Sequence, residues 1–285
     1  MAKTSVQIDL DRPAGPYYPG GPVQATITLQ NEKELTVRRA TAWLVLREEY
    51  KYVRRSAKGH VTRYTETEEL RYDQAGLVEE GVIPAGTHTY PVSLRLPDDA
   101  IPSYSGKITK NNWLVKAKFD CPKAFDAEAE AEVPLIVPPP GRNVAPVEVG
   151  EAQRCEEAEL RLWLPRLEWV EGETIEGKLL VQPRENFSVN EVRLELTRTE
   201  YVPRASGDTE SHAEGKVKLA DKVEFWPAHP VEYRFALPVP RQGMPTRSTQ
   251  FSTVTWSLTA TLARRLRKDS AIGAQIEVYN GPAPT

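Results

Sequence analysis

The sequence predicts an all-β chain made of two β-sandwiches in tandem. Three observations support this: apolar and polar residues alternate at a period of two, glycine and proline divide the chain into short segments, and one order of segments occurs twice. No long helical period is present, and the only helix we expect is a short one near residues 98–105. With 285 residues, each half can bury a core of its own.

The first matched segments open each half of the chain. Residues 18–29 read YPGGPVQATITL and residues 170–181 read VEGETIEGKLLV, and in both a glycine, Gly20 or Gly172, precedes an alternating strand. Such alternation is typical of a strand with one buried face. The preceding strands correspond as well: Val6, Ile8 and Leu10 match Leu160, Leu162 and Leu164.

A long hairpin follows in each half. The strand ATAWLVLREEY ends at Tyr50, and EVRLELTRTEY ends at Tyr201. Each strand leads to a glycine-containing tip, AKGH at 57–60 and ASGD at 205–208, as a hairpin turn requires. Beyond the hairpins, both halves continue with a strand that ends in Leu-Pro, a crossover that contains proline, and a strand with a tryptophan. We therefore expect two immunoglobulin-like sandwiches related by duplication.

The tryptophans divide into two groups by strand phase. Trp43, Trp113 and Trp256 fall in phase with the apolar side of their strands and are predicted to fill the cores. Trp163 has the opposite parity to its apolar neighbours, and we expect it, like Trp226, to be exposed. A row of exposed aromatic residues would favour a carbohydrate platform, but the phase of the first group opposes that interpretation.

The predicted boundaries follow the proline pattern. Residues 1–137 form the first sandwich, 138–157 a Pro-rich and acidic linker, and 158–285 the second sandwich. Consecutive prolines donate no ladder hydrogen bonds, so this connector is extended and semi-rigid. The predicted interdomain hinge consists of Pro138, Pro139, Pro140 and Gly141.

The strand DAEAEAEV at 126–133 carries all of its acids on one face. Those acids could form a binding strip. They could also form a solvated face that protects an edge strand from aggregation, and we favour this second interpretation.

Composition excludes several classes of function. The net charge is -3 and neither sign dominates, which argues against a nucleic-acid-binding protein. No stretch approaches the roughly 18 apolar residues of a membrane-spanning helix, and no apolar leader-like region opens the sequence, so we expect a cytoplasmic protein. Hydrophobic residues make up 40% and charged residues 27%, as in a soluble globular chain.

We find no motif for catalysis. The sequence lacks a nucleophile elbow, a phosphate loop and a zinc-protease motif, and its two cysteines, Cys121 and Cys155, form no paired motif and are expected to be small reduced side chains. Asp120 and Asp126 flank one turn, but two carboxylates fall short of the roughly six to eight oxygens that calcium prefers. The sequence therefore predicts no enzyme, no cofactor and no metal.

The matched segments resemble the arrestin family. YYPGGPVQATI, the Leu-Pro end of LRLPDDAIPSYSG, and WLVKAKFDCP are similar to the N-terminal arrestin domain, and the second half resembles the second arrestin domain more loosely. The family includes visual and β-arrestins, arrestin-domain adaptors, the retromer cargo-binding subunit and bacterial sporulation-control proteins. PPPG at 138–141 is not the Pro-Pro-x-Tyr of relatives that recruit ubiquitin ligases, and the composition resembles prokaryotic members.

The resemblance implies a non-enzymatic scaffold or adaptor with a regulatory or trafficking role. Such a protein would bind protein partners through its sheet faces and its exposed strand edges, and two copies could pair through an edge strand. The alternative is a carbohydrate- or ligand-binding sandwich module. An enzyme would need ionisable groups converging in a pocket.

One loop is a candidate site for an anionic partner. ARRLRKD at 263–269 concentrates cations that could bind a phosphorylated or acidic peptide or a lipid head group. A solvated loop tip is the simpler interpretation, and we favour it. The candidate residues are Arg264, Arg265, Arg267 and Lys268.

Overall fold

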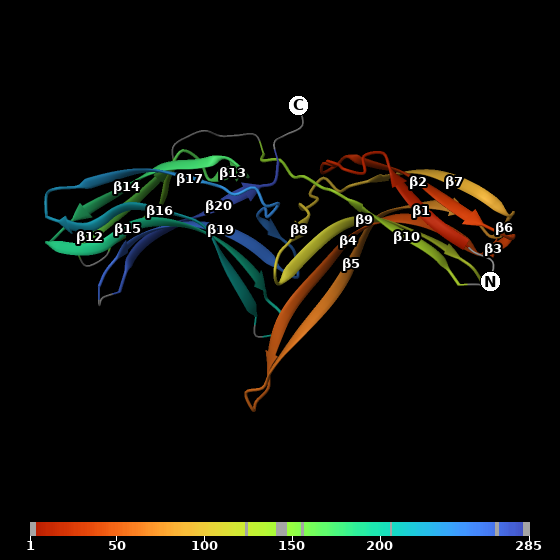
Figure 1. The fold of residues 1–285 in the computed structure, drawn as a ribbon, viewed down its shortest axis with the longest axis horizontal. Helices are drawn as coiled ribbons and strands as arrows, with labels where there is room; N and C mark the ends of the chain where they lie inside the picture. The colour runs from red at the N-terminus through yellow and green to blue at the C-terminus, as the bar shows by residue number, and fades with distance from the viewer. Residues whose placement is uncertain are drawn as a thin grey trace. The chain divides into compact units, whose positions relative to one another are not determined.

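The computed structural model describes residues 4–122, 125–140, 147–154, 157–205, 207–265 and 268–281, with the backbone alone for 147–154. Every regular element in these ranges is a β-strand (Figure 1). The short helix expected near residues 98–105 is absent. Pro97 accepts a hydrogen bond from the Ala100 N–H in a tight turn instead, and Tyr104–Ser105 forms a short strand.

Contacts divide the chain into two compact units, which are 1–105 with 109–137, and 106–108 with 138–285. The first unit has a three-stranded sheet in the order β1-β2-β7, a larger sheet in the order β10-β9-β4-β5 with β8 beside β9, and a small pair, β3 and β6. Their bounds are β1 Thr4–Leu10, β2 Pro22–Asn31, β3 Leu35–Val37, β4 Arg39–Arg55, β5 Val61–Val78, β6 Gly81–Ile83, β7 Gly86–Arg95, β8 Tyr104–Ser105, β9 Thr109–Asp120 and β10 Ala127–Val133.

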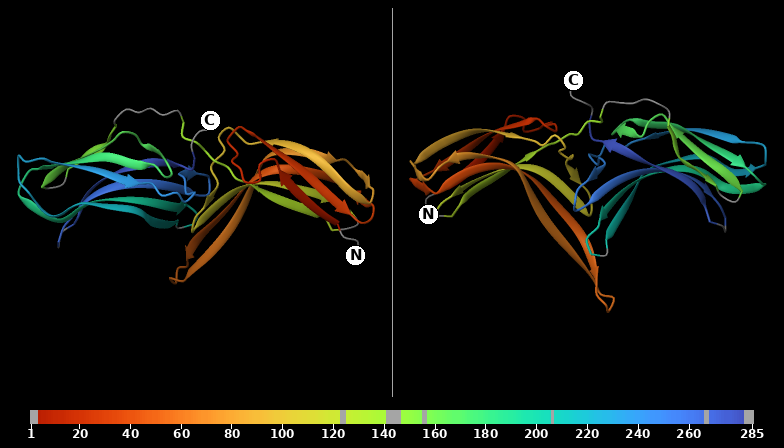
Figure 2. Two further views of the ribbon diagram at one scale, coloured as in Figure 1. Left: turned by 45° about the horizontal axis from the view of Figure 1, so that its top comes forward. Right: turned by 180° about the vertical axis from the view of Figure 1, so that it is seen from behind.

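The second unit has one sheet in the order β11-β12-β14-β17 and another in the order β13-β20-β19-β15-β16, with β18 beside β19. Their bounds are β11 Val147–Arg154, β12 Ala158–Leu164, β13 Glu168–Val170, β14 Thr174–Pro183, β15 Phe187–Val202, β16 Asp208–Phe225, β17 Val231–Pro238, β18 Arg247–Ser248, β19 Thr253–Ala263 and β20 Ser270–Tyr279. Figure 2 shows the two sheets of each unit from two further sides.

The two units repeat one topology. The sheet β1-β2-β7 corresponds to β12-β14-β17, and β10-β9-β4-β5 corresponds to β20-β19-β15-β16. Strand β11 has no counterpart, and it lies within 138–157, which the sequence assigns to a linker. The linker assignment is wrong over this stretch because VEV at 147–149 alternates as a strand does and pairs with the exposed edge of β12, Val147 opposite Leu164.

Each core contains a buried tryptophan at the same place in the repeated topology. Trp113 and Trp256 are fully buried, as their phase predicts. Their indole N–H groups donate to a carbonyl twelve residues upstream, Ile101 O at 2.9 Å and Met244 O at 2.9 Å. A buried indole N–H needs an acceptor, so each crossover is fixed against the core by the same hydrogen bond.

Trp43 is buried on the other face of its sheet. Its strand places Ala42 and Leu44 in the first core, whereas Trp43 packs with Val45 and Leu114, and the Arg71 guanidinium lies 4.5 Å from its ring centroid. The core assignment of Trp43 is therefore corrected. In the run AWLVL both parities are apolar, so alternation alone does not specify which face points inward.

The glycines that open the matched segments share one backbone conformation. Gly20 and Gly172 have φ of 72° and 84°, and their N–H groups donate to Pro97 O at 3.0 Å and Val239 O at 2.9 Å. This left-handed conformation is costly for any residue with a Cβ. Glycine therefore recurs at this place in both halves because the backbone there has a positive φ.

Replacing Gly20 by alanine is expected to lower the free energy of unfolding of the first unit by about 1–2 kcal/mol, because alanine must adopt the positive φ. Urea denaturation followed by tryptophan fluorescence measures this loss. The control is Gly76→Ala, at a position without positive φ where a Cβ meets open space. Equal stability of the two variants would contradict the explanation.

Candidate partner-binding groove

The basic loop predicted from the sequence is partly committed to the core of the second unit. The Arg264 side chain is 8% exposed; its Nη1 donates to Glu157 Oε1 at 2.5 Å and its guanidinium lies 5.3 Å from the Phe187 ring centroid. Arg265 and Lys268 are exposed, and Arg267 lies outside the described residues. The Arg264 side chain is therefore engaged by Glu157 and Phe187 within the second unit and is not available to a partner.

The predicted hinge follows the last strand of the first unit. Pro138, Pro139 and Pro140 have no regular structure, and the boundary between the two units falls between Val137 and Pro138. Gly141 lies outside the described residues.

The acidic strand β10 is an edge strand, and its Glu128 and Glu130, like Asp126 just before it, pair with cations of β4 and β9. Arg47 donates to both oxygens of Glu130 at 2.9 and 2.6 Å, which lowers the pKa of that carboxyl. Lys118 pairs with Asp126 at 2.7 Å and with Glu128 at 2.9 Å. A strip neutralised in this way suits the protection of a sheet edge better than the binding of a cation.

The remaining candidates for chemistry are also engaged in structure. Asp120 pairs with Arg38 at 2.6 Å, and the described part of the chain contains no group of three potential metal ligands. Cys121 is buried, and this burial raises the pKa of its thiol, the opposite of what a nucleophile needs. Cys155 lies outside the described residues.

One cluster of ionisable groups is buried in the second unit. Arg198 donates to Glu200 at 2.7 Å and to Glu214 at 2.8 Å. The Glu200 carboxylate also accepts the backbone N–H groups of Lys107, at 3.1 Å, and Ile108, at 2.8 Å. Glu200 is fully buried and both of its oxygens are occupied, so the cluster fixes the segment 106–108 within the second unit.

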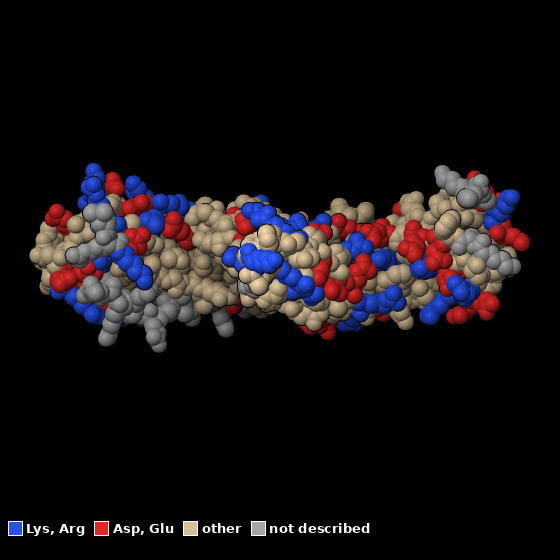
Figure 3. All heavy atoms as spheres, turned by 90° about the horizontal axis from the view of Figure 1, so that it is seen from below, with Lys and Arg blue, Asp and Glu red and all other residues tan. Residues whose placement is uncertain are grey.

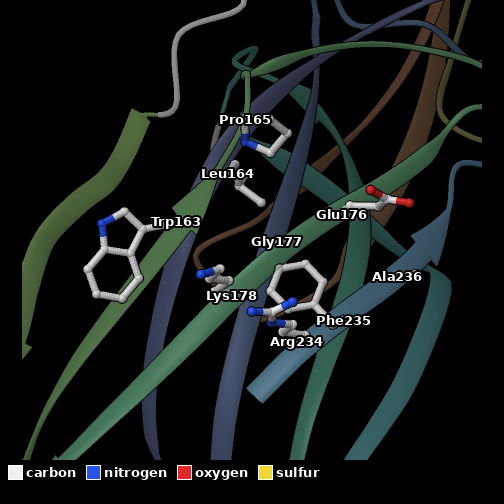
Figure 4. Close-up of a pocket in the computed structure, with 9 residues that line it drawn as sticks. All are labelled: Trp163, Leu164, Pro165, Glu176, Gly177, Lys178, Arg234, Phe235 and Ala236. Carbon is white, nitrogen blue, oxygen red and sulfur yellow. The ribbon is translucent and has the colours of Figure 1, made fainter. Parts of the chain in front are cut away.

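A groove of about 600 Å³ lies on the sheet β12-β14-β17 of the second unit (Figure 4). It is lined by 176–178 of β14, 234–236 of β17 and 163–165, of which Pro165 directly follows the end of β12. The pairing register places Trp163, Lys178 and Arg234 in one row across the three strands. Trp163 is half-buried beside the buried Leu162 and Leu164, so it points away from the core as its parity predicts.

Gly177 shapes the sheet at the centre of the groove. A Cβ at this position would lie 2.5 Å from Phe235 Cζ and 2.6 Å from Trp163 O. Only glycine therefore allows the Phe235 ring and the end of β12 to approach so closely. The closely packed rings and backbone give the groove an apolar floor.

The groove has a charged rim. Lys178 Nζ and Arg234 Nε each lie 3.4 Å from Glu232 Oε1, so the two cations share one exposed carboxylate. Glu176 borders the same groove. An apolar floor with a few polar groups around it is the usual composition of a binding site.

Strand β17 borders the groove and is the last strand of its sheet, with β14 on one side only. Its counterpart β7 also ends its sheet but is interrupted by Pro91. Because proline cannot donate to an added strand, β17 is the more suitable of the two edges for pairing with a peptide.

Residues 6–139 match the family model described as Arrestin (or S-antigen), N-terminal domain. The match spans the first unit almost completely, from β1 to just beyond β10. A search of curated proteins found no match. Within the described ranges, the chain has no helix long and apolar enough to cross a membrane.

Proposed function

This chain belongs to an arrestin-like family through its domain at residues 6–139, and on that premise we propose that it is a non-enzymatic scaffold that binds protein partners. Partners bind through the sheet faces and strand edges of the sandwiches. The all-β architecture supports this role because it offers broad surfaces and several strand edges.

The observation that carries the proposal is the open edge of β17 beside the Trp163 groove. An extended peptide that pairs with β17 gains backbone hydrogen bonds, which supply affinity. Every second side chain of that peptide then faces the groove side of the sheet. A bulky apolar side chain fits the floor between Trp163 and Ala236 and supplies specificity.

A carbohydrate- or ligand-binding module is the second candidate, favoured only by Trp163. A sugar platform needs several aromatic faces in a row, and Trp163 is the single aromatic residue on the outward side of this groove. The large exposed aromatics of the described residues lie on other elements: Tyr64, Tyr72, Phe125, Tyr201 and Trp226. A peptide is therefore the better-supported ligand.

Replacing Ala236 by arginine is expected to weaken peptide binding by about tenfold or more, because the long side chain fills the floor of the groove. Peptides selected from an immobilised library by the wild-type chain serve as ligands, and their affinities are measured by fluorescence anisotropy. The matched control is Gln182→Arg, which adds the same side chain to an exposed position of β14 outside the groove.

The peptides should bind the control as they bind the wild type. If Ala236→Arg retained full affinity, the peptide-binding site would lie outside the groove. Selection of glycans in place of peptides by a parallel glycan array would favour the second candidate.

A further inference from the structure

The tip of the β4–β5 hairpin is a basic surface that the sequence motifs do not single out. Beyond Tyr50, strand β4 no longer pairs with β9 and pairs with β5 alone, so the hairpin continues as a two-stranded ribbon (Figure 1). We call residues 51–65 the basic tip. It contains five cations and no acid: Lys51, Arg54, Arg55, Lys58 and Arg63.

Most of these cations have no carboxylate partner. Lys51 lies 3.8 Å from Glu49, but no ion pair of the described residues involves Arg54, Arg55, Lys58 or Arg63. All four are exposed. A positive charge left uncompensated at an exposed position is available to an external anion.

The cations cover both faces of the ribbon and its turn. Arg55 pairs with Val61 and Arg63 with Val53, which places both arginines on one face, while Arg54 lies on the other face over the rings of Tyr52 and Tyr64. Lys58 occupies the turn. The charges thus spread around the tip and do not converge on one point, which suits an extended anionic surface better than a single phosphate group.

Apolar side chains lie among the cations. Val61 is 57% exposed and Tyr64 is 41% exposed. Figure 3 looks onto this tip, where Lys and Arg side chains surround uncharged atoms. Tyrosine and aliphatic side chains next to lysine and arginine are the composition expected where a protein meets lipid head groups.

The stem of the hairpin has the opposite charge. Glu48 and Glu49 precede the basic tip, and Glu66, Glu68 and Glu69 follow it. Glu66 accepts the hydroxyl groups of Tyr50, at 2.9 Å, and Tyr52, at 2.7 Å, which ties the two strands together below the tip. Glu69 is paired with Arg47 at 2.7 Å and with Lys116 at 3.0 Å, so the uncompensated charge of the ribbon is the positive charge of its tip. An anionic surface would therefore attract the ribbon end-on.

We infer that the basic tip docks on a phospholipid bilayer rich in anionic lipids, with Arg55, Lys58 and Arg63 against the head groups. Val61 and Tyr64 then lie at head-group depth. This membrane contact belongs to the first unit, whereas the β17 groove belongs to the second.

The test measures flotation of the full chain with vesicles of phosphatidylcholine containing about 30 mol % phosphatidylserine. Each cation near such a surface raises partitioning by about fivefold. The variant Arg55→Glu/Lys58→Glu/Arg63→Glu is therefore expected to lose at least about 50-fold in partitioning. Arg54 is kept because it packs on two tyrosine rings.

The control reverses three exposed cations elsewhere, Lys33→Glu/Arg39→Glu/Lys222→Glu, with the same change in net charge. It should float like the wild type, and circular dichroism should show both variants folded. Wild-type chain that floats no better with the anionic vesicles than with pure phosphatidylcholine overturns the inference, as does equal loss in the two variants. If the tip bound duplex DNA but not vesicles, its partner would be another polyanion, and the inference of membrane docking would be wrong.

Discussion

Replacing Arg198 by methionine is expected to lower the free energy of unfolding of the second unit by about 3–5 kcal/mol. The substitution removes the cation that lies between Glu200 and Glu214, and Glu200 is fully buried. A carboxylate left in an apolar interior without its partner has lost both its hydration and its compensating charge. Urea denaturation followed by fluorescence of the second-unit tryptophans measures the loss.

Arg193→Met on the same strand is the matched control. Arg193 pairs with Glu195 at 3.0 Å, but its side chain and that of Glu195 remain 20% and 38% exposed. Water can replace its contacts, so this variant should lose no more than about 1 kcal/mol. Similar losses from the two substitutions would show that burial of the Arg198 cluster contributes little.

Replacing Trp256 by alanine is expected to cost about 3–5 kcal/mol in the second unit. The side chain is fully buried in the centre of the core, and its removal leaves a cavity together with an unsatisfied Met244 carbonyl. The measurement is again the midpoint of urea unfolding, with near-ultraviolet circular dichroism to report on core packing.

Trp226→Ala serves as the control because this tryptophan, on the loop after β16, is 50% exposed. Its loss should change stability by about 0.5 kcal/mol or less. If removal of Trp226 destabilised the chain as much as removal of Trp256, burial would not explain the importance of the core tryptophan.

The fold could be predicted from the sequence because local pattern and tertiary environment agree along most strands. Alternation identifies a strand with one buried face, and the repeated order of glycine, hairpin and tryptophan shows that the pattern is duplicated. The prediction failed where that agreement breaks. Trp43 lies in a strand with apolar residues on both faces, and β11 follows a proline-rich run that suggested a linker.

The sites were less predictable because they depend on register and on long-range pairs. The parity of Trp163 was visible, but its row with Lys178 and Arg234 follows only from the strand pairing. The cations at 264–268 look free in the sequence, since Glu157, which binds Arg264, is more than a hundred positions away. The acid-free run at 51–65 was readable, yet only the unpaired ribbon gives it an exposed position.

The hydrogen bonds from the Lys107 and Ile108 N–H groups to the Glu200 carboxylate determine where the gene can be divided. A fragment that starts at Pro138 contains Glu200 but lacks the Lys107 and Ile108 N–H groups that donate to its carboxylate. A division at the proline run therefore leaves residues 106–108 of the second unit in the other fragment. An expression fragment for the second sandwich keeps its full set of hydrogen bonds only if the strand-linking peptide 106–108 is supplied with it.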